Sequence, residues 1–242
     1  MRAHSLWVRF STPTTVPHAA VILAVCAVVT ATLVWWRPWK YVRHGVTWVH
    51  EGGHAVAALL VGGRIRGMRL NHDTSGRTTT AIPVSNFRQA IVSYWGYPAP
   101  AAFGTLLALG VWSGYVLASL AFVALLAIVT VFLIRNWWGL LVVATVGILV
   151  GLTAWVIPAR YAAWPVVGIA TFMLWGSLRS MTETVRARKH RQLDPNDLGN
   201  DVYGVSRPLD LPPGFVEFTW CLTWAAAAYG AGWLILGSTV PR

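Results

Sequence analysis

The stretch Val49-His50-Glu51-Gly52-Gly53-His54-Ala55-Val56 carries the pattern H-E-x-x-H inside an apolar run from residue 45 to residue 61. On a helix, residues four apart share one face and lie about one turn apart. Both imidazoles can therefore bind one tetrahedral Zn²⁺, and Glu51 lies beside that face, where it can deprotonate a metal-bound water. Such groups are costly in an apolar helix without a polar task. The stretch predicts a metal site around which the chain folds; the alternative is two hydrogen-bonded histidines.

The composition is that of a membrane protein. Of 242 residues, 56% are hydrophobic and only 11% are charged, and the mean hydropathy is +0.56. Several apolar runs approach the roughly 20 residues that a spanning helix needs. The net charge of +11 does not indicate a nucleic-acid partner, because the basic residues lie between apolar runs, as topology determinants do. Cys26 and Cys221 both fall in apolar runs, so no disulfide framework is expected.

We therefore expect an all-α polytopic membrane protein with six to seven transmembrane helices and a short β-hairpin after the HExxH helix. A polar tail, residues 1–18, is expected to be disordered over residues 1–17 and to precede a single transmembrane domain at residues 19–237. Spans are expected at residues 19–36, 40–61, 87–109, 111–134, 137–157, 161–178 and 215–237. In the third of these, Gly96-Tyr97-Pro98 and Pro100 predict a kink or a broken helix.

The hairpin is expected at about residues 62–85. Residues 64–70 alternate basic or small residues with apolar ones, and residues 77–83 are rich in threonine. The turn-forming residues between them complete a hairpin pattern, and the alternative is a plain solvated loop. His72 and Asp73 are interpreted as turn residues rather than ligands.

The distribution of Lys and Arg predicts the topology. With a cytoplasmic N-terminus and seven spans, the inside segments hold 14 of these residues and the outside segments five. The hairpin and a cytoplasmic loop at residues 179–213 then lie on the same side as the inner end of the motif helix. An acid from that loop can thus reach the two histidines without crossing the bilayer.

The sequence also resembles a known family. Residues 50–65 resemble the start of the M50B-like branch of the site-2 protease family, in which the motif helix is likewise followed by Gly-Gly and a strand-like stretch ending in Gly-x-Thr. The corresponding residues here are Gly62-Gly63 and Gly76-Arg77-Thr78. The family's next segment has a Gly-Pro-rich entry, which Gly96-Tyr97-Pro98 resembles, and near its end Asn200-Asp201 followed by Leu211-Pro212 fits the family's spacing.

This resemblance implies that Asp201 joins His50 and His54 as a Zn²⁺ ligand, with Asp197 as the competing candidate, and that Glu51 is the catalytic base. It implies an intramembrane endopeptidase of the cell membrane that cleaves membrane-protein substrates in the lipid bilayer. The chain lacks the Asp-Gly pair after the third ligand and the PDZ-sized insert of better-known members. The alternative function is a non-proteolytic metal-binding transporter or an assembly factor with a degenerate protease site. Nothing in the sequence indicates an oligomeric state or a further cofactor.

Overall fold

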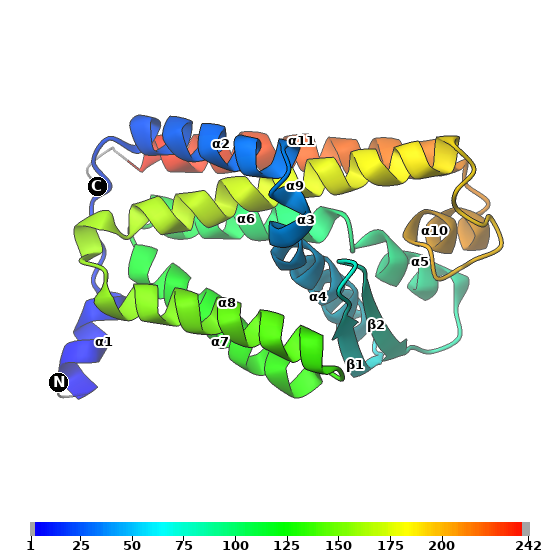
Figure 1. Ribbon diagram of the computed structural model, residues 1–242, viewed down its shortest axis with the longest axis horizontal. Coiled ribbons are helices and arrows are strands. Elements are labelled where there is room, and N and C mark those ends of the chain that lie inside the picture. The colour runs from blue at the N-terminus through cyan, green and yellow to red at the C-terminus, as the bar shows by residue number, and fades with distance from the viewer. Residues whose placement is uncertain (1–2, 239–242) are drawn as a thin grey trace.

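The computed structural model describes residues 3–238, and it is mostly helical (Figure 1). Helices α2, α6, α9 and α11 form one layer of long helices, and α7 and α8 form a helical pair beside it. Helix α4 runs between the two groups and leads into the only sheet of the described residues.

The elements are α1 (Ala3–Ser11), α2 (Ala19–Trp35), α3 (Trp39–Val42), α4 (His44–Leu60), β1 (Arg64–Leu70), β2 (Gly76–Ala81), α5 (Asn86–Tyr94), α6 (Pro98–Trp112), α7 (Val116–Leu133), α8 (Trp137–Val156), the 3₁₀ turn η1 (Ala159–Tyr161), α9 (Ala163–Lys189), α10 (Asp201–Leu209) and α11 (Pro213–Gly237).

Three helical segments are each long and apolar enough to cross a membrane: α7, α8 and the stretch Ala159–Lys189 that contains α9. A fourth candidate is the pair Ala19–Trp35 and Trp39–Leu60, which qualifies jointly and is bent by 94° at its break. Helix α6 is apolar but shorter. The chain is therefore a multi-pass membrane protein, and the number of six to seven spans stays a prediction.

Small residues allow the long helices to pack closely. Ala108 of α6 and Val166 and Ala170 of α9 are all fully buried in the largest apolar cluster. At Gly104 of α6, an added Cβ would lie 2.7 Å from the carbonyl oxygen of Ala170. Close backbone approach of this kind is typical of helix pairs in membranes, where small residues line the interface. The layer around α6 and α9 forms a fixed frame against which α4 packs.

The segment before the motif helix turns sharply. Helix α2 ends at Trp35, and Pro38 precedes the short helix α3, as expected from a residue that cannot continue a helix. Helix α4 then runs to Leu60 and stops at Gly62, which has the positive φ of 80° that glycine accepts without strain. Because of the 94° bend, α4 crosses the layer of long helices instead of running parallel to it.

The predicted hairpin is confirmed, and a plain solvated loop is excluded. Strands β1 and β2 pair antiparallel, from Leu70 opposite Gly76 to residue 64 opposite residue 81. In the connecting turn, Asp73 accepts hydrogen bonds from the backbone N and the hydroxyl of Ser75, at 3.0 and 2.7 Å. These bonds hold the pKa of the Asp73 carboxyl below its usual range. His72 stacks on Trp138, with ring centroids 3.8 Å apart. Both residues therefore serve the turn, as expected.

Strand β1 contains a β-bulge at Arg66. Ile65 pairs with Thr80 and Gly67 pairs with Thr79, so Arg66 has no partner in the ladder. The extra residue changes the phase of the strand, because side chains alternate between the two faces of a sheet. One face carries the buried Met68 and Leu70, and the other face carries exposed arginines.

The third predicted span is a broken helix, as the prolines indicate. Helix α5 ends at Tyr94, and α6 begins at Pro98, which occupies the first turn, where a missing backbone N–H is tolerated. The break at residues 95–97 lies next to the motif helix, since an added Cβ on Gly53 of α4 would lie 2.5 Å from the carbonyl oxygen of Trp95.

Two predictions about loops are wrong. The N-terminal tail contains helix α1, and Arg9 ties it to the end of α8 by donating to the carbonyl oxygens of Ala154 and Ile157, at 3.1 and 2.7 Å. The predicted loop at residues 179–213 is largely helical, because α9 continues to Lys189 and α10 occupies part of the remainder. Two ion pairs favour the longer α9: Arg179 and Glu183, one turn apart, lie 2.9 Å apart, and Arg188 pairs with Glu217 of α11 at 2.6 Å.

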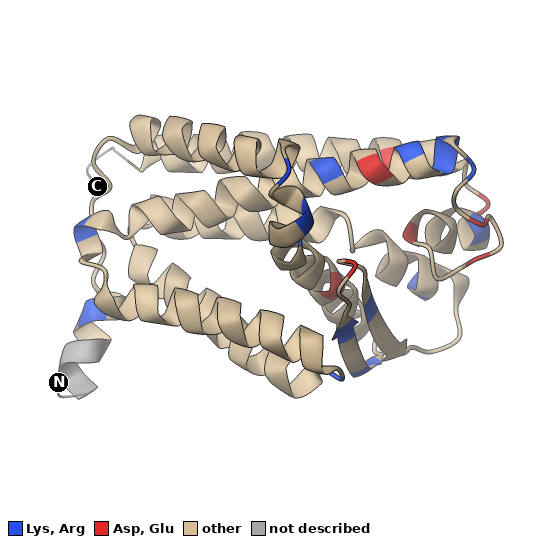
Figure 2. Ribbon diagram, in the orientation of Figure 1, with Lys and Arg blue, Asp and Glu red and all other residues tan. Residues whose placement is uncertain are grey.

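Charged residues are concentrated at one end of the molecule. Figure 2 shows most Lys and Arg residues on the hairpin, on α5 and α10, and at the end of α9, whereas the opposite end carries Arg9 and Arg160. The turn between α7 and α8 lies at the charged end, where the backbone N of Arg135 donates to the carbonyl oxygen of Met68 at 2.8 Å. The hairpin is therefore attached directly to the end of a helical pair that is long and apolar enough to span a membrane.

Candidate metal centre

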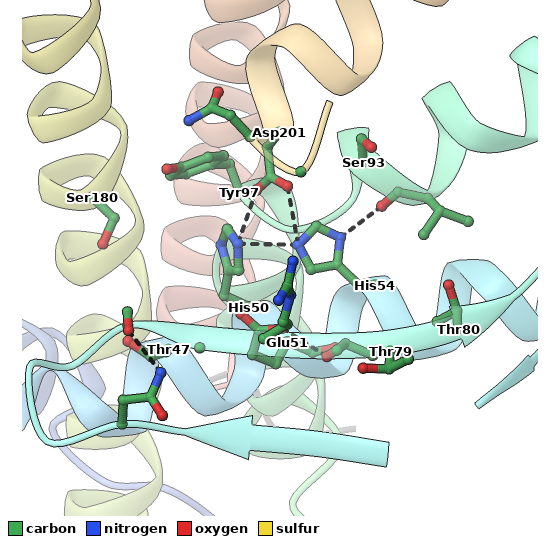
Figure 3. Close-up of a pocket in the computed structure, with 18 of the residues that line it drawn as sticks. Thr47, His50, Glu51, His54, Thr79, Thr80, Ser93, Tyr97, Ser180 and Asp201 are labelled. Atoms are coloured by element: carbon green, nitrogen blue, oxygen red, sulfur yellow. Dashed lines mark hydrogen bonds and ion pairs between the residues drawn. The ribbon is translucent and has the colours of Figure 1, made fainter. Parts of the chain in front are cut away.

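Helix α4 presents His50 and His54 on one face, as the spacing predicts. Their Nε2 atoms lie 3.2 Å apart, and the ring planes are nearly perpendicular, at 80°. Both side chains are largely buried, with 17% and 13% of their surface exposed. The two nitrogens therefore point at one small volume beside the helix (Figure 3).

Asp201 reaches both imidazoles from the distant end of the chain. Its Oδ2 lies 2.9 Å from Nε2 of His50, and its Oδ1 lies 3.3 Å from Nε2 of His54. Asp201 is the first residue of α10, and the side chain of Asn200 caps that helix by accepting from the backbone N of Val202 at 3.1 Å. The cap fixes where the helix begins and thereby where the Asp201 carboxylate points.

Close packing of α10 on α5 holds this carboxylate in place. An added Cβ on Gly204 would lie 2.4 Å from the hydroxyl oxygen of Ser93, so only glycine permits this approach without a shift of the neighbouring side chain. Val202 and Val205 are buried with Trp220 of α11 in a common apolar cluster. Trp220 in turn donates from its indole nitrogen to the carbonyl oxygen of Tyr94 at 3.2 Å. Three helices thus fix the late acid against the motif helix.

The tautomer of His54 is set by a backbone acceptor. Its Nδ1 lies 2.7 Å from the carbonyl oxygen of Val92 in α5, to which it donates. In the neutral imidazole the other nitrogen, Nε2, then carries a lone pair, and this lone pair faces the Asp201 carboxylate. Two acceptors at such a distance repel each other unless a proton or a cation lies between them. The arrangement is the one that metal-binding histidines commonly have, with the second ring nitrogen bonded to a carbonyl.

The donor set fits a zinc ion. Bonds of about 2.0–2.1 Å in a tetrahedron place neighbouring ligand atoms about 3.3 Å apart. The three distances among the Nε2 atoms of His50 and His54 and the carboxylate oxygens of Asp201 are 2.9, 3.2 and 3.3 Å. Potential ligand atoms of His50, Glu51 and His54 also lie within 4.8 Å of one another. Two nitrogens and one carboxylate are a ligand combination that catalytic zinc sites use.

Glu51 lies beside these three residues and is held by the hairpin. Only 4% of the residue is exposed, and its Oε2 accepts a hydrogen bond from the hydroxyl of Thr78 in β2 at 2.7 Å. The same hydroxyl lies 3.0 Å from the backbone carbonyl oxygen of Glu51. An added Cβ on Gly76 would lie 2.4 Å from Oε1 of Glu51. The strand therefore fits closely over this carboxylate and fixes its direction.

The break between α5 and α6 leaves room for the rings. An added Cβ on Gly96 would lie 2.6 Å from both Cε1 and Nε2 of His54 and 2.7 Å from Cε1 of His50. The next residue, Tyr97, packs edge-on against His50, with ring centroids 4.7 Å apart. Its hydroxyl is hydrogen-bonded to that of Thr184 in α9, and its carbonyl oxygen accepts from Ser177 at 2.9 Å.

These groups line a cavity of about 840 Å³. The cavity extends from the histidines along β2, whose Thr78, Thr79 and Thr80 form part of its wall. Asn200 and Asp201 line it at the start of α10, and Arg43, the residue that precedes α4, lines it as well. A space of this size beside two imidazoles and two carboxylates can admit an extended peptide segment and water.

A family model described as Peptidase M50B-like matches residues 22–235, nearly the whole chain. The chain belongs to this family. Its members are zinc metallopeptidases, and the group of His50, Glu51 and His54 resembles an HExxH site. No curated protein and no solved structure matched the chain in the corresponding comparisons.

The structure separates the two acidic candidates of the late segment. Asp197 is exposed, and its Oδ1 accepts from the backbone N of Gly199 at 2.8 Å, so it shapes a turn. Asp201 is the one that lies against the imidazoles. Sequence reasoning missed the carbonyl of Val92, which has no side-chain signature. It also missed Thr78 as the partner of Glu51, although the threonine-rich pattern of β2 offered that signal.

Proposed function

We propose that this protein is a zinc-dependent intramembrane endopeptidase that hydrolyses peptide bonds of membrane-embedded proteins. The observation that supports it best is the position of Asp201, which meets two histidines about 150 positions earlier in the sequence at 2.9 and 3.3 Å. His50, His54 and Asp201 would hold the ion. When bound, zinc lowers the pKa of a water towards about 7 and polarises a carbonyl group.

Glu51 would be the general base and acid of the reaction. Its carboxylate adjoins the imidazoles, and Thr78 keeps one of its oxygens engaged, which leaves the other to accept a proton from the attacking water. The same carboxylate would then pass this proton to the departing amine. Burial of Glu51 under β2 keeps bulk water from competing for that proton.

The substrate would bind along β2. In an intact substrate helix, the peptide bonds are occupied by internal hydrogen bonds, so cleavage requires an extended segment. Part of the outer edge of β1 is already occupied. Met68 forms a bridge with Ile134, and the side chain of Asn136 is hydrogen-bonded to the backbone N and O of Leu70, so a further strand could not pair with all of β1. Among residues 3–238, β2 pairs only with β1, and its other edge borders the cavity. An added strand there would lie beside the histidines.

The proposed location is the cell membrane, with the end that carries the hairpin and α10 in the cytoplasm. Helix α1 lies at the opposite end of the molecule, so the cytoplasmic N-terminus expected from the sequence is not part of this proposal. The excess of Lys and Arg at the end that carries the hairpin and α10 supports this orientation (Figure 2). The site would then open near the cytoplasmic surface.

The first test measures bound zinc in the purified full-length protein. We expect about one zinc ion per chain in the native protein and in Glu51→Gln, because the glutamate is not one of the three proposed ligands. Asp201→Asn is expected to lose most of the zinc, since a neutral amide is a poor ligand. Asp197→Asn is the matched control, because the same chemical change is made four residues earlier. Equal zinc in both aspartate variants would refute the role of Asp201.

The second test compares cells that produce the native protein with cells that produce Glu51→Gln. New N-termini of membrane proteins are quantified in both by mass spectrometry. Loss of a general base slows proton transfer about 10²–10⁴-fold, so fragments specific to the native protein should be almost absent with the variant. If the two proteins yield the same fragments while both retain zinc, the endopeptidase proposal fails and a non-proteolytic role remains.

A further inference from the structure

The outer face of the hairpin is densely basic. Four exposed arginines belong to the two strands, and a fifth, Arg135, lies at the turn between α7 and α8 with its side chain over Gly67. We call these residues the arginine face: Arg64, Arg66, Arg69, Arg77 and Arg135. Arg69 and Arg77 are directly opposite each other in the ladder, a placement that like charges disfavour.

The bulge brings these arginines together. In a regular strand, Arg64 and Arg69 would point to opposite faces, because five positions separate them. The unpaired Arg66 shifts the alternation by one residue, so that Arg64 and Arg69 both lie on the exposed face, together with Arg77. The strand thereby buries Met68 and Leu70 and exposes every one of its arginines.

Acids do not balance this charge. Within the described part of the chain, none of the five arginines forms an ion pair with an acidic side chain. Arg135 donates to the carbonyl oxygens of Phe132 and Ile134, which leaves its positive charge uncompensated. Asp73, the acid of the hairpin turn, is bonded to Ser75. Such a face is suited to an anionic partner from outside the chain.

The position of the face indicates which anion is available. The turn at Arg135 joins α7 and α8, two helices that are long and apolar enough to span a membrane, so this turn lies near the bilayer surface. Phe132 and Trp137 flank it with 73% and 77% of their surface exposed, as is typical of aromatic side chains at a membrane interface. Because β1 is bonded to this turn, the arginine face lies at the level of the lipid headgroups.

We propose that the arginine face binds the phosphate groups of anionic phospholipids in the surrounding bilayer. Guanidinium groups pair with phosphate oxygens through two parallel hydrogen bonds, and several such groups on one rigid sheet would hold headgroups beside the cavity. The binding would stabilise β2 in the position where Thr78 contacts Glu51. This proposal does not depend on peptidase activity.

The test measures lipid retention by the full-length protein in detergent. The protein is equilibrated with equal amounts of phosphatidylglycerol and phosphatidylcholine, and the lipids that remain bound after size-exclusion chromatography are quantified by mass spectrometry. We expect the native protein to retain phosphatidylglycerol preferentially. Each basic residue near an anionic surface strengthens attachment about fivefold, so the triple variant R64Q/R69Q/R77Q should bind phosphatidylglycerol about 100-fold more weakly.

A matched control removes three positive charges elsewhere at the same end of the molecule. The variant R186Q/K189Q/R191Q changes exposed residues at and just after the end of α9 and should retain the native preference. The conservative variant R64K/R69K/R77K keeps the charge and should also retain phosphatidylglycerol. Thermal unfolding in phosphatidylcholine shows that each variant is folded before its lipids are counted.

Three results would overturn the proposal. The first is an unchanged lipid preference in the glutamine variant of the hairpin. The second is an equal loss in the α9 control, since net charge alone would then explain binding. The third is a glutamine variant of the hairpin that retains lipid normally but cleaves substrates with acidic segments more slowly than the native protein. That result would make the arginine face a site for protein substrates.

Discussion

Gly96 offers a direct test of how closely the histidines are confined. An alanine at this position would place its Cβ 2.6 Å from Cε1 and Nε2 of His54 and 2.7 Å from Cε1 of His50. Ordinary contacts begin at 3.4 Å, so one or both rings must retreat by about 0.8 Å. Metal–ligand distances tolerate only about 0.2 Å. The substitution should therefore weaken zinc binding without removing a ligand.

The size of the effect follows from the cost of overpacking. Inserting a methyl group into a filled site typically costs about 1–3 kcal/mol. If that strain is concentrated in the metal-bound state, Gly96→Ala should lower zinc affinity about 5–150-fold. The assay is competition between the purified protein and a chelating dye of known affinity. Activity is not needed for this measurement.

Gly52→Ala is the matched control on the motif helix itself. An added Cβ at Gly52 meets no atom within 4 Å, and alanine favours the interior of a helix by about 0.5–1 kcal/mol. This variant should bind zinc like the native protein and unfold at the same temperature or slightly higher. Native zinc affinity in Gly96→Ala, or an equal loss in Gly52→Ala, would refute the argument from steric confinement.

Three further substitutions test how the hairpin supports the site. Thr78→Val removes the 2.7 Å hydrogen bond to Glu51, a bond to a charged group worth about 1.5–3 kcal/mol, and should reduce turnover while the zinc content measured by mass spectrometry stays unchanged. Gly76→Ala would place a Cβ 2.4 Å from Oε1 of the same carboxylate and should reduce turnover more strongly; normal turnover would show that the strand can move away. Asn136→Ala removes both hydrogen bonds to the backbone of Leu70 and should lower the midpoint of thermal unfolding, whereas an unchanged midpoint would show that the strand is held by packing alone.

The sequence predicted those parts of the site that depend on local spacing. The interval between His50 and His54 fixes a common helix face whatever the rest of the chain does, and two β-prone runs around a turn form a hairpin locally. The choice of Asp201 over Asp197 as the acid nearest the imidazoles came from family spacing, and the structure explains it through the cap at Asn200.

Other features depend on contacts between distant segments and could not be read from one sequence. The carbonyl of Val92 is a backbone group, which every residue has, so nothing marked it as the partner of His54. Helix α1 is short, and Arg9 attaches it to the rest of the molecule by donating to carbonyl oxygens of α8 and of the C-cap residue of α8. The bulge at Arg66 was not predicted, although the sequence carries a signal for it: apolar residues change phase between Ile65 and Met68, which uniform alternation does not explain.

The bulge also determines which changes of length the hairpin can absorb. Deleting Arg66 would leave a continuous ladder, in which every remaining residue of β1 keeps its partner and its face. Deleting Met68 instead would slip the pairing after that point by one position, turning Leu70 towards solvent and moving Gly76 away from Glu51. Relatives with shorter hairpins should therefore lack the unpaired residue. Apart from that residue, the number of residues between the end of the motif helix and the hairpin turn should be constant.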